Sequence, residues 1–108
     1  LTSLTAKKKK FSLDFMLEKN FKKEISTGII ERANFIEMPS FLIEELIRLI
    51  LRKKGVALPS QKVLSEIMNV FFHNKPTNKS YVEWSRKDGE QIGGKVFSEH
   101  NDIIFKKK

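Results

Sequence analysis

The amino-acid sequence predicts an α+β fold, with a helical N-terminal part followed by a central helix-turn-helix pair packed on a small antiparallel β-meander. Three observations predict this class: two apolar stripes of helical period, a corner of glycine and proline between them, and alternating segments after residue 80. Because 108 residues suffice for about one hydrophobic core, we divide the chain into a helical or linker segment, 1–28, and one small α+β domain, 29–108.

The N-terminal segment joins a lysine-rich stretch to a predicted helix. Residues 1–10 end in four lysines, which is more typical of a solvated segment than of an arm that binds nucleic acid. The helix begins after Ser12, whose hydroxyl suits an N-cap, and ends at Gly28. A short alternating strand over 11–15 is the competing interpretation. The apolar face of the predicted helix consists of Leu13, Met16, Leu17 and Phe21.

The segment 29–38 is too short for its periodicity to decide its structure. It fits a short helix, a strand, or both in succession. A strand over 35–38 followed by two helices has the element order of ribbon-helix-helix DNA-binding proteins, so a dimer of that kind is an alternative. Such a strand would offer few donors to base edges. The two possible outward sets are Asn34, Ile36 and Met38, or Phe35 and Glu37.

The first central helix is predicted to begin at Pro39 and to end at Gly55. Proline suits the first helical position because its missing N–H costs nothing there, and glycine suits a left-handed terminator. Arg52, Lys53 and Lys54 occupy the last turn, where the helix dipole favours cations. The apolar face consists of Ile43, Leu46, Ile47 and Ile50, widened by Leu42 and Leu49.

The second central helix is predicted to begin after Pro59-Ser60, with the Ser60 hydroxyl accepting a hydrogen bond from the first turn. Both central helices are expected to bury their apolar faces. Phe41, Leu51 and Phe72 lie outside the two stripes, which indicates that another element covers the pair. The apolar face of the second helix consists of Val63, Leu64, Ile67, Met68 and Phe71.

Alternating segments after residue 80 predict a β-meander. Strands are expected over 81–85, 90–97 and 103–105. Asp88-Gly89 is a turn signal between the first two strands, and a second turn is expected over 99–102. Gly93-Gly94 indicates a β-bulge or the close approach of another backbone.

No group of residues in this sequence predicts catalysis, a metal site or a cofactor site. His73 and His100 are its two histidines, and neither has a partner at metal-ligand spacing. Gly93-Gly94-Lys95 lacks the strand-to-helix context of a phosphate-binding loop. The absence of Cys excludes disulfides and thiolate ligands, and no apolar run reaches the roughly 18 residues of a membrane span.

The charge balance predicts binding to a polyanion. Lys and Arg number 21 against 13 Asp and Glu, which is a formal net charge of +8. Clustered cations neutralise phosphates without reading bases, which suits the backbone and A-form shape of structured RNA. The candidate nucleic-acid-binding residues are Arg48, Arg52, Lys53, Lys54, Lys75, Lys79, Arg86, Lys87 and Lys95.

Several of these motifs together resemble the substrate-binding domain of tRNA(Ile)-lysidine synthetase. That family shows Leu-Pro before a helix rich in Leu and Arg, a Gly turn with a Pro-Ser start to the next helix, and a closing β-meander. The resemblance covers residues 29–105, and the Pro-Ser after the glycine turn is its most telling part. The residues that carry it are Met38-Pro39, Ile50-Leu51-Arg52, Gly55-Val56-Ala57-Leu58-Pro59-Ser60, Leu64, Ile67, Val82-Glu83-Trp84 and Ile103–Phe105.

The resemblance implies a cytoplasmic parent enzyme, a ligase that uses ATP to attach lysine to the wobble cytidine of an isoleucine tRNA. The catalytic domain of that family, with its Ser-Gly-Gly-containing PP-loop, has no counterpart in this sequence. We therefore expect an excerpt that grips tRNA and binds neither ATP nor another cofactor itself, with tRNA and the rest of the parent chain as its partners. The family often has an Arg-rich, Tyr-containing strand where this chain has 93–97, so RNA contacts are not carried over to that strand.

A structural or protein-interaction module is the third hypothesis. It requires Phe72 and Trp84 to be exposed as anchors for a partner protein. It also predicts negligible salt-dependent affinity for RNA, because phosphate contacts would then play no part in binding.

Overall fold

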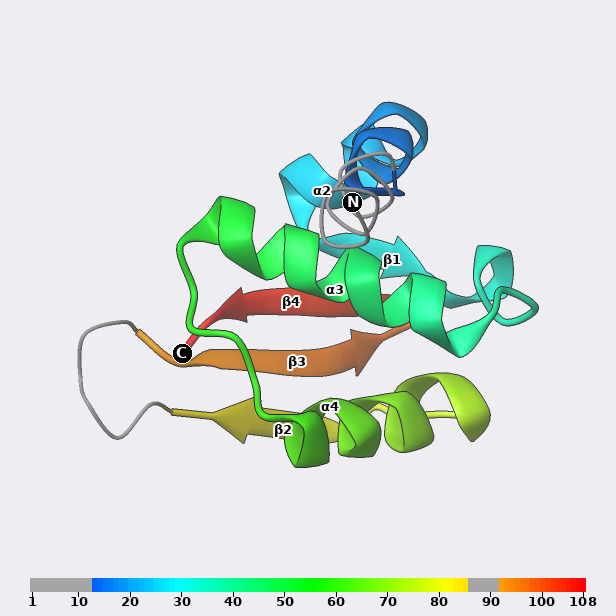
Figure 1. Ribbon diagram of the computed structural model, residues 1–108. Coiled ribbons are helices and arrows are strands. Elements are labelled where there is room, and N and C mark those ends of the chain that lie inside the picture. Colours follow the sequence, from blue (N-terminus) through cyan, green and yellow to red (C-terminus); the bar gives the residue numbers. More distant parts are fainter. Residues whose placement is uncertain (1–12, 86–91) are drawn as a thin grey trace.

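The computed structural model describes residues 13–85 and 92–108, in which helices pack on a four-stranded antiparallel sheet (Figure 1). The predicted α+β class is confirmed. None of the helices in these two ranges is long and apolar enough to span a membrane. After a helical stretch at 13–20, the elements are α2 (Lys22–Thr27), β1 (Ile29–Glu31), the 3₁₀-helix η1 (Arg32–Asn34), α3 (Ser40–Lys54), α4 (Gln61–Met68), the π-helix η2 (Asn69–His73), β2 (Tyr81–Trp84), β3 (Gly94–Glu99) and β4 (Asp102–Lys107).

The predicted N-terminal helix is present from residue 13 but is interrupted at Phe21, so the alternative of a strand over 11–15 is wrong. Leu17 is fully buried, whereas Met16, expected on the same apolar face, is 40% exposed. Gly28, with a φ of 74°, ends α2 in the left-handed conformation, as predicted. Leu17 of the helical stretch 13–20 and Ile25 of α2 belong to the same hydrophobic core as the sheet, so this segment packs into the domain from residue 13 onward. The predicted N-cap Ser12 lies outside the described residues.

Local sequence signals mark where α3 begins and ends. Pro39 stands one residue before the helix, in an extended conformation, rather than at the first helical position. Gly55 ends the helix at a φ of 70°, a conformation that L residues with a side chain adopt only at a cost. The buried side chains of α3 are Ile43, Leu46, Ile47, Leu49, Ile50 and Leu51.

The α4 helix begins as predicted, because the Ser60 hydroxyl accepts a hydrogen bond from the backbone N–H of Val63 at 3.3 Å. Its last turn continues into η2, which buries Phe71 and Phe72. Arg32 of η1 donates hydrogen bonds to backbone carbonyls at the end of η2. Its Nε donates to the carbonyl of Phe71 at 2.9 Å. The Nη2 atom of the same side chain donates to the carbonyls of Phe72 and Asn74, both at 3.3 Å.

The sheet has the order β1-β4-β3-β2, and its last three strands form the predicted meander. Of the alternatives left open for residues 29–38, a strand and a short helix in succession are present, and the strand, β1, pairs with β4 through Ile30 opposite Ile103. The turn between β3 and β4 places His100 at a φ of 57°. Figure 1 shows α3 lying across β4 and α4 over β2, and these pairs pack against each other. The predicted turn at Asp88-Gly89 lies outside the described residues.

Trp84 joins the meander to the α3–α4 corner. Its indole N–H donates to the carbonyl of Ala57 at 2.7 Å, and its ring fills the space that a side chain at Gly94 would need. A Cβ on Gly93 would meet the backbone of Trp84, so the predicted close approach of another backbone is confirmed at this glycine pair. Val56, in the same corner, forms an isolated bridge with Ile92.

Two premises of the alternative functions are wrong. Residues 35–38 form a turn with Phe35 buried, not the strand that a ribbon-helix-helix dimer would pair across its two-fold axis. Phe72 and Trp84 are 4% and 6% exposed, so they are core residues and not anchors for a partner protein.

Candidate nucleic-acid interface

The last turn of α3 carries Arg52, Lys53 and Lys54, as the sequence predicts. Two of these cations contact carboxylates of the helical stretch 13–20. Arg52 Nη1 lies 3.7 Å from Asp14 Oδ2, and Lys53 Nζ lies 3.6 Å from Glu18 Oε1. Because surface ion pairs of this kind are weak, the two cations remain available to a phosphate, but part of their charge is balanced within the chain.

Among the predicted binding residues that the structure describes, Arg48 is the least available. Its Nη1 lies 2.6 Å from Glu45 Oε1, and its Nη2 donates to the side-chain carbonyl of Gln61 at 3.3 Å. The guanidinium therefore links α3 to the first residue of α4. We assign Arg48 to the stability of the helical corner rather than to RNA binding.

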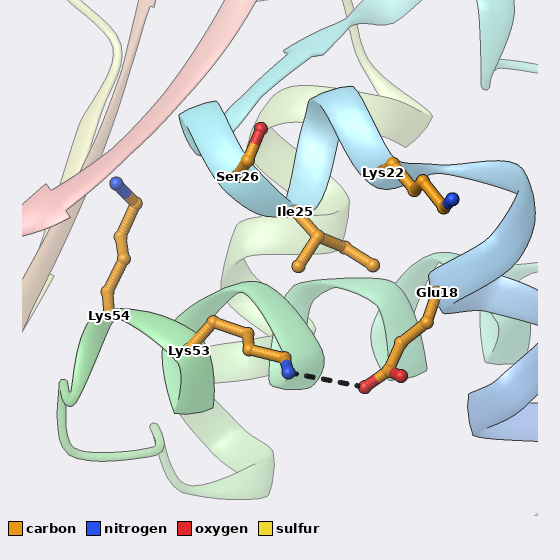
Figure 2. Close-up of a pocket in the computed structure, with 6 residues that line it drawn as sticks. All are labelled: Glu18, Lys22, Ile25, Ser26, Lys53 and Lys54. Atoms are coloured by element: carbon orange, nitrogen blue, oxygen red, sulfur yellow. Dashed lines mark ion pairs between the residues drawn. The ribbon is translucent and has the colours of Figure 1, made fainter.

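A pocket of about 450 Å³ lies between α2 and the end of α3 (Figure 2). Figure 2 shows that its ammonium groups do not converge: Lys22 lies on the α2 side, Lys53 pairs with Glu18, and Lys54 reaches away toward β4. A compact anion would therefore find no set of donors aimed at one point. The lining residues are Glu18, Lys22, Ile25, Ser26, Lys53 and Lys54.

Lys54 connects the end of α3 to the end of β4. Its Cε and Nζ lie close to Gly28, as does the backbone carbonyl of Phe105 in β4. Beyond Phe105 the chain continues as Lys106, Lys107 and Lys108. Strand pairing then places Lys95 opposite Lys106. We call this group the basic end: Arg52, Lys53, Lys54, Lys95, Lys106, Lys107 and Lys108.

The basic end contains cations that the sequence analysis did not select. The three terminal lysines were visible as a charge run, but their place beside α3 depends on the pairing of β4 with β1 and β3. The Nζ of Lys108 donates to Ser85 Oγ at 2.7 Å and lies 3.9 Å from Glu83 Oε1. The basic end thus draws on α3, β3 and β4 together.

The structure does not bring Lys75 and Lys79 into the basic end. Both are exposed in the segment that precedes Tyr81, at the start of β2. The basic end lies by the other end of β2, where Trp84 pairs with Gly94 and Gly94 with Lys107. Two other predicted residues, Arg86 and Lys87, lie outside the described residues.

The hydrogen bonds of His73 are those of a structural residue. His73 bridges two helices, with Nε2 3.1 Å from Ser40 Oγ and Nδ1 3.2 Å from Asn69 Oδ1. Within 13–85 and 92–108, no three His, Cys, Asp or Glu residues come together in a group that could hold a metal ion.

Comparisons of the chain with protein-family models, with curated proteins and with solved structures found no match.

Proposed function

We propose that this chain is the tRNA-binding domain of a tRNA(Ile)-lysidine synthetase. The observation that carries the proposal is the basic end, where cations of α3, β3 and β4 lie at the same end of the sheet in a folded α+β domain. Such an arrangement neutralises neighbouring phosphates of a rigid RNA backbone without reading its bases. The parent enzyme would supply ATP and lysine chemistry from a PP-loop domain elsewhere in its chain.

The motifs that carry the family resemblance also support the proposal, because each occupies a position where its residue type is needed. Gly55 is the left-handed terminator of α3, and Ser60 caps α4. Trp84 fastens this corner to the meander through its hydrogen bond to Ala57. The glycine turn, the Pro-Ser start and the strand of the resemblance are thus parts of one corner, and the last turn of α3, with Arg52, Lys53 and Lys54, leads directly into it.

Binding to an isoleucine tRNA at two ionic strengths tests the RNA-binding part of the proposal. With about four phosphates neutralised, the affinity is expected to fall about 100-fold between about 50 and 200 mM salt. Replacement of Lys54 and Lys106 by Glu should weaken binding and flatten the salt dependence. The matched control replaces Lys75 and Lys79, which lie away from the basic end, and should change the affinity much less. An affinity that does not respond to salt would refute phosphate binding.

The synthetase assignment needs its own test, in the complete natural protein that contains this chain. That protein is expected to transfer lysine to the wobble cytidine of an isoleucine tRNA in the presence of ATP. The measurement is the incorporation of labelled lysine into the tRNA, with omission of ATP as the control. If the chain binds tRNA but the complete protein transfers no lysine, the assignment to this enzyme fails and RNA binding remains.

A further inference from the structure

The two faces of the sheet differ sharply in exposure. One face packs under the helices and carries Ile30, Val96 and Phe105, all fully buried. Because neighbouring residues of a strand point to opposite sides, the residues between them lie on the second face. On β2, for example, Val82 and Trp84 are buried while Tyr81 and Glu83 are exposed. We call this second face the open face.

A row of apolar and aromatic side chains crosses the open face. Ile29 of β1 pairs with Ile104 of β4, Ile104 pairs with Phe97 of β3, and Phe97 pairs with Tyr81 of β2. Ile29 is 39% and Tyr81 50% exposed, and the two side chains between them are half-buried. With strands about 4.8 Å apart, the row is about 14 Å long and only one residue wide.

Charged rows flank this strip on both sides. On the side of the basic end, strand pairing aligns Lys106, Lys95 and Glu83. The ammonium of Lys106 lies 5.8 Å from the centre of the Phe97 ring, within the range of a cation–π contact. The opposite row is acidic and consists of Glu31, Asp102 and Glu99.

The Tyr81 ring is held in place at the edge of the strip. Its hydroxyl donates to Glu83 Oε2 at 2.5 Å, so the ring is tied to a neighbour on the same strand. This hydrogen bond, with smaller contributions from burial and from the charge of Glu83, raises the pKa of Tyr81 above its ordinary value of 10.0. The phenol is protonated at physiological pH, as an ordinary tyrosine is, and its hydrogen bond ties the ring to Glu83.

We propose that the open face binds unpaired nucleotides of RNA. Bases would stack on the exposed ring of Tyr81 and on Phe97, and the adjoining phosphates would contact Lys95 and Lys106. Aromatic rings on a four-stranded sheet stack two or three bases in known RNA-binding modules, and a strip about 14 Å long accommodates a stack of that size. Base stacking tolerates any sequence because every base has a flat face.

Lys95 and Lys106 along one edge favour RNA over a protein as the occupant, because the phosphates would lie on that edge, away from the acidic row of Glu31, Asp102 and Glu99. A protein interface of stable size has a broad apolar centre, whereas this strip is one residue wide and has charged rows along both edges. The lysine row belongs to the basic end, so a strand of RNA that leaves the strip passes directly onto further cations. The identity of the RNA as a tRNA rests on the proposed function. The further inference is that unpaired nucleotides of that tRNA bind to the open face.

The experiment compares a short labelled oligouridine with a base-paired RNA of equal charge, both titrated with this chain at low salt. Replacement of Tyr81 by Ala is expected to weaken oligouridine binding between about 5-fold and 150-fold, the range measured for one stacked base. Binding of the paired RNA should stay unchanged. Tyr81→Phe keeps the ring and should keep the affinity. Phe41→Ala removes an aromatic side chain that is 60% exposed on α3, and serves as the matched control.

Nuclear magnetic resonance supplies a direct readout, because Tyr81 is the single tyrosine of the chain. Stacking should move its ring resonances upfield when oligouridine is added. The inference is overturned if these resonances do not move, if Tyr81→Ala binds oligouridine like the unmodified chain, or if the open face proves to be a dimer interface that Tyr81→Ala disrupts. Oligouridine binding without salt-dependent tRNA binding would instead refute the proposed function and leave the open-face site standing.

Discussion

Replacing Trp84 by Phe tests whether one buried hydrogen bond holds the α3–α4 corner, and with it the basic end, against the sheet. The indole N–H donates to the carbonyl of Ala57 at 2.7 Å, and both residues are buried. Phenylalanine keeps most of the ring but has no donor. The Ala57 carbonyl would then lose its contact with Trp84 in a place where water does not replace it.

The expected loss of stability has two parts. Leaving a buried acceptor without its donor costs about 1–3 kcal/mol. The smaller ring also removes about two buried carbons beside Gly94 and Val56, which adds about 1–2 kcal/mol. We therefore expect Trp84→Phe to lower the free energy of unfolding by about 2–5 kcal/mol, a large fraction of the about 5–15 kcal/mol typical of a domain.

Urea denaturation followed by far-ultraviolet circular dichroism measures this change, because the substitution removes the single tryptophan and with it the fluorescence signal. Tyr81→Phe is the matched control on the same strand, since it also removes one donor but at an exposed position on the other face. It should change the free energy of unfolding by less than about 0.5 kcal/mol. If Trp84→Phe is equally mild, Trp84 does not anchor the corner.

Further predictions concern backbone conformation, helix closure and titration. Gly55→Ala should lower the free energy of unfolding, measured by urea denaturation, by about 1–2 kcal/mol, because the φ of Gly55 is left-handed but the space around it is open. Gly28→Ala should lower it further, because a Cβ there also meets a backbone carbonyl. Arg32→Met should lower the free energy of unfolding by about 2–3 kcal/mol, since backbone carbonyls at the end of η2 lose a charged donor. The Tyr81 phenol should titrate above pH 10.0 by phenolate absorbance, and Glu83→Ala should lower that midpoint. Because the pKa of Tyr81 is higher in the folded state than in the unfolded state, the stabilisation that this hydrogen bond contributes is complete below pH 10.0 and is lost as the pH rises through the folded-state pKa. A titration midpoint at the ordinary value would refute the assigned hydrogen bond.

The parts of the fold that follow from local chemistry could be predicted from the sequence. The Ser60 cap involves a donor three residues away, and the left-handed end of α3 depends on Gly55 alone. The apolar periodicity of α3 and α4 likewise reports their buried faces, since each stripe lies on one side of one helix. Alternation identified Tyr81–Trp84 as a half-buried strand for the same reason.

The parts that depend on distant partners could not be predicted. The β1 strand is three residues long, too short for a periodic signal, and its partner Ile103 lies far along the chain from Ile30. Trp84 was expected to be exposed in one hypothesis because nothing in its own segment shows that the α3–α4 corner covers it. Arg52 and Lys53 likewise find Asp14 and Glu18 only because the N-terminal helical segment packs beside α3.

The sequence by itself determined the α+β class, the end of α3 at Gly55, the start of α4 after Ser60 and the excess of positive charge. These properties depend on composition and on residues within about one helical turn of each other. Only the tertiary structure decided which cations share a surface and which residues share the open face. Strand pairing places Ile29, Ile104, Phe97 and Tyr81 in one row, although they come from four separate strands. That row exists because the register of the strands aligns it, and register is a property of the whole sheet.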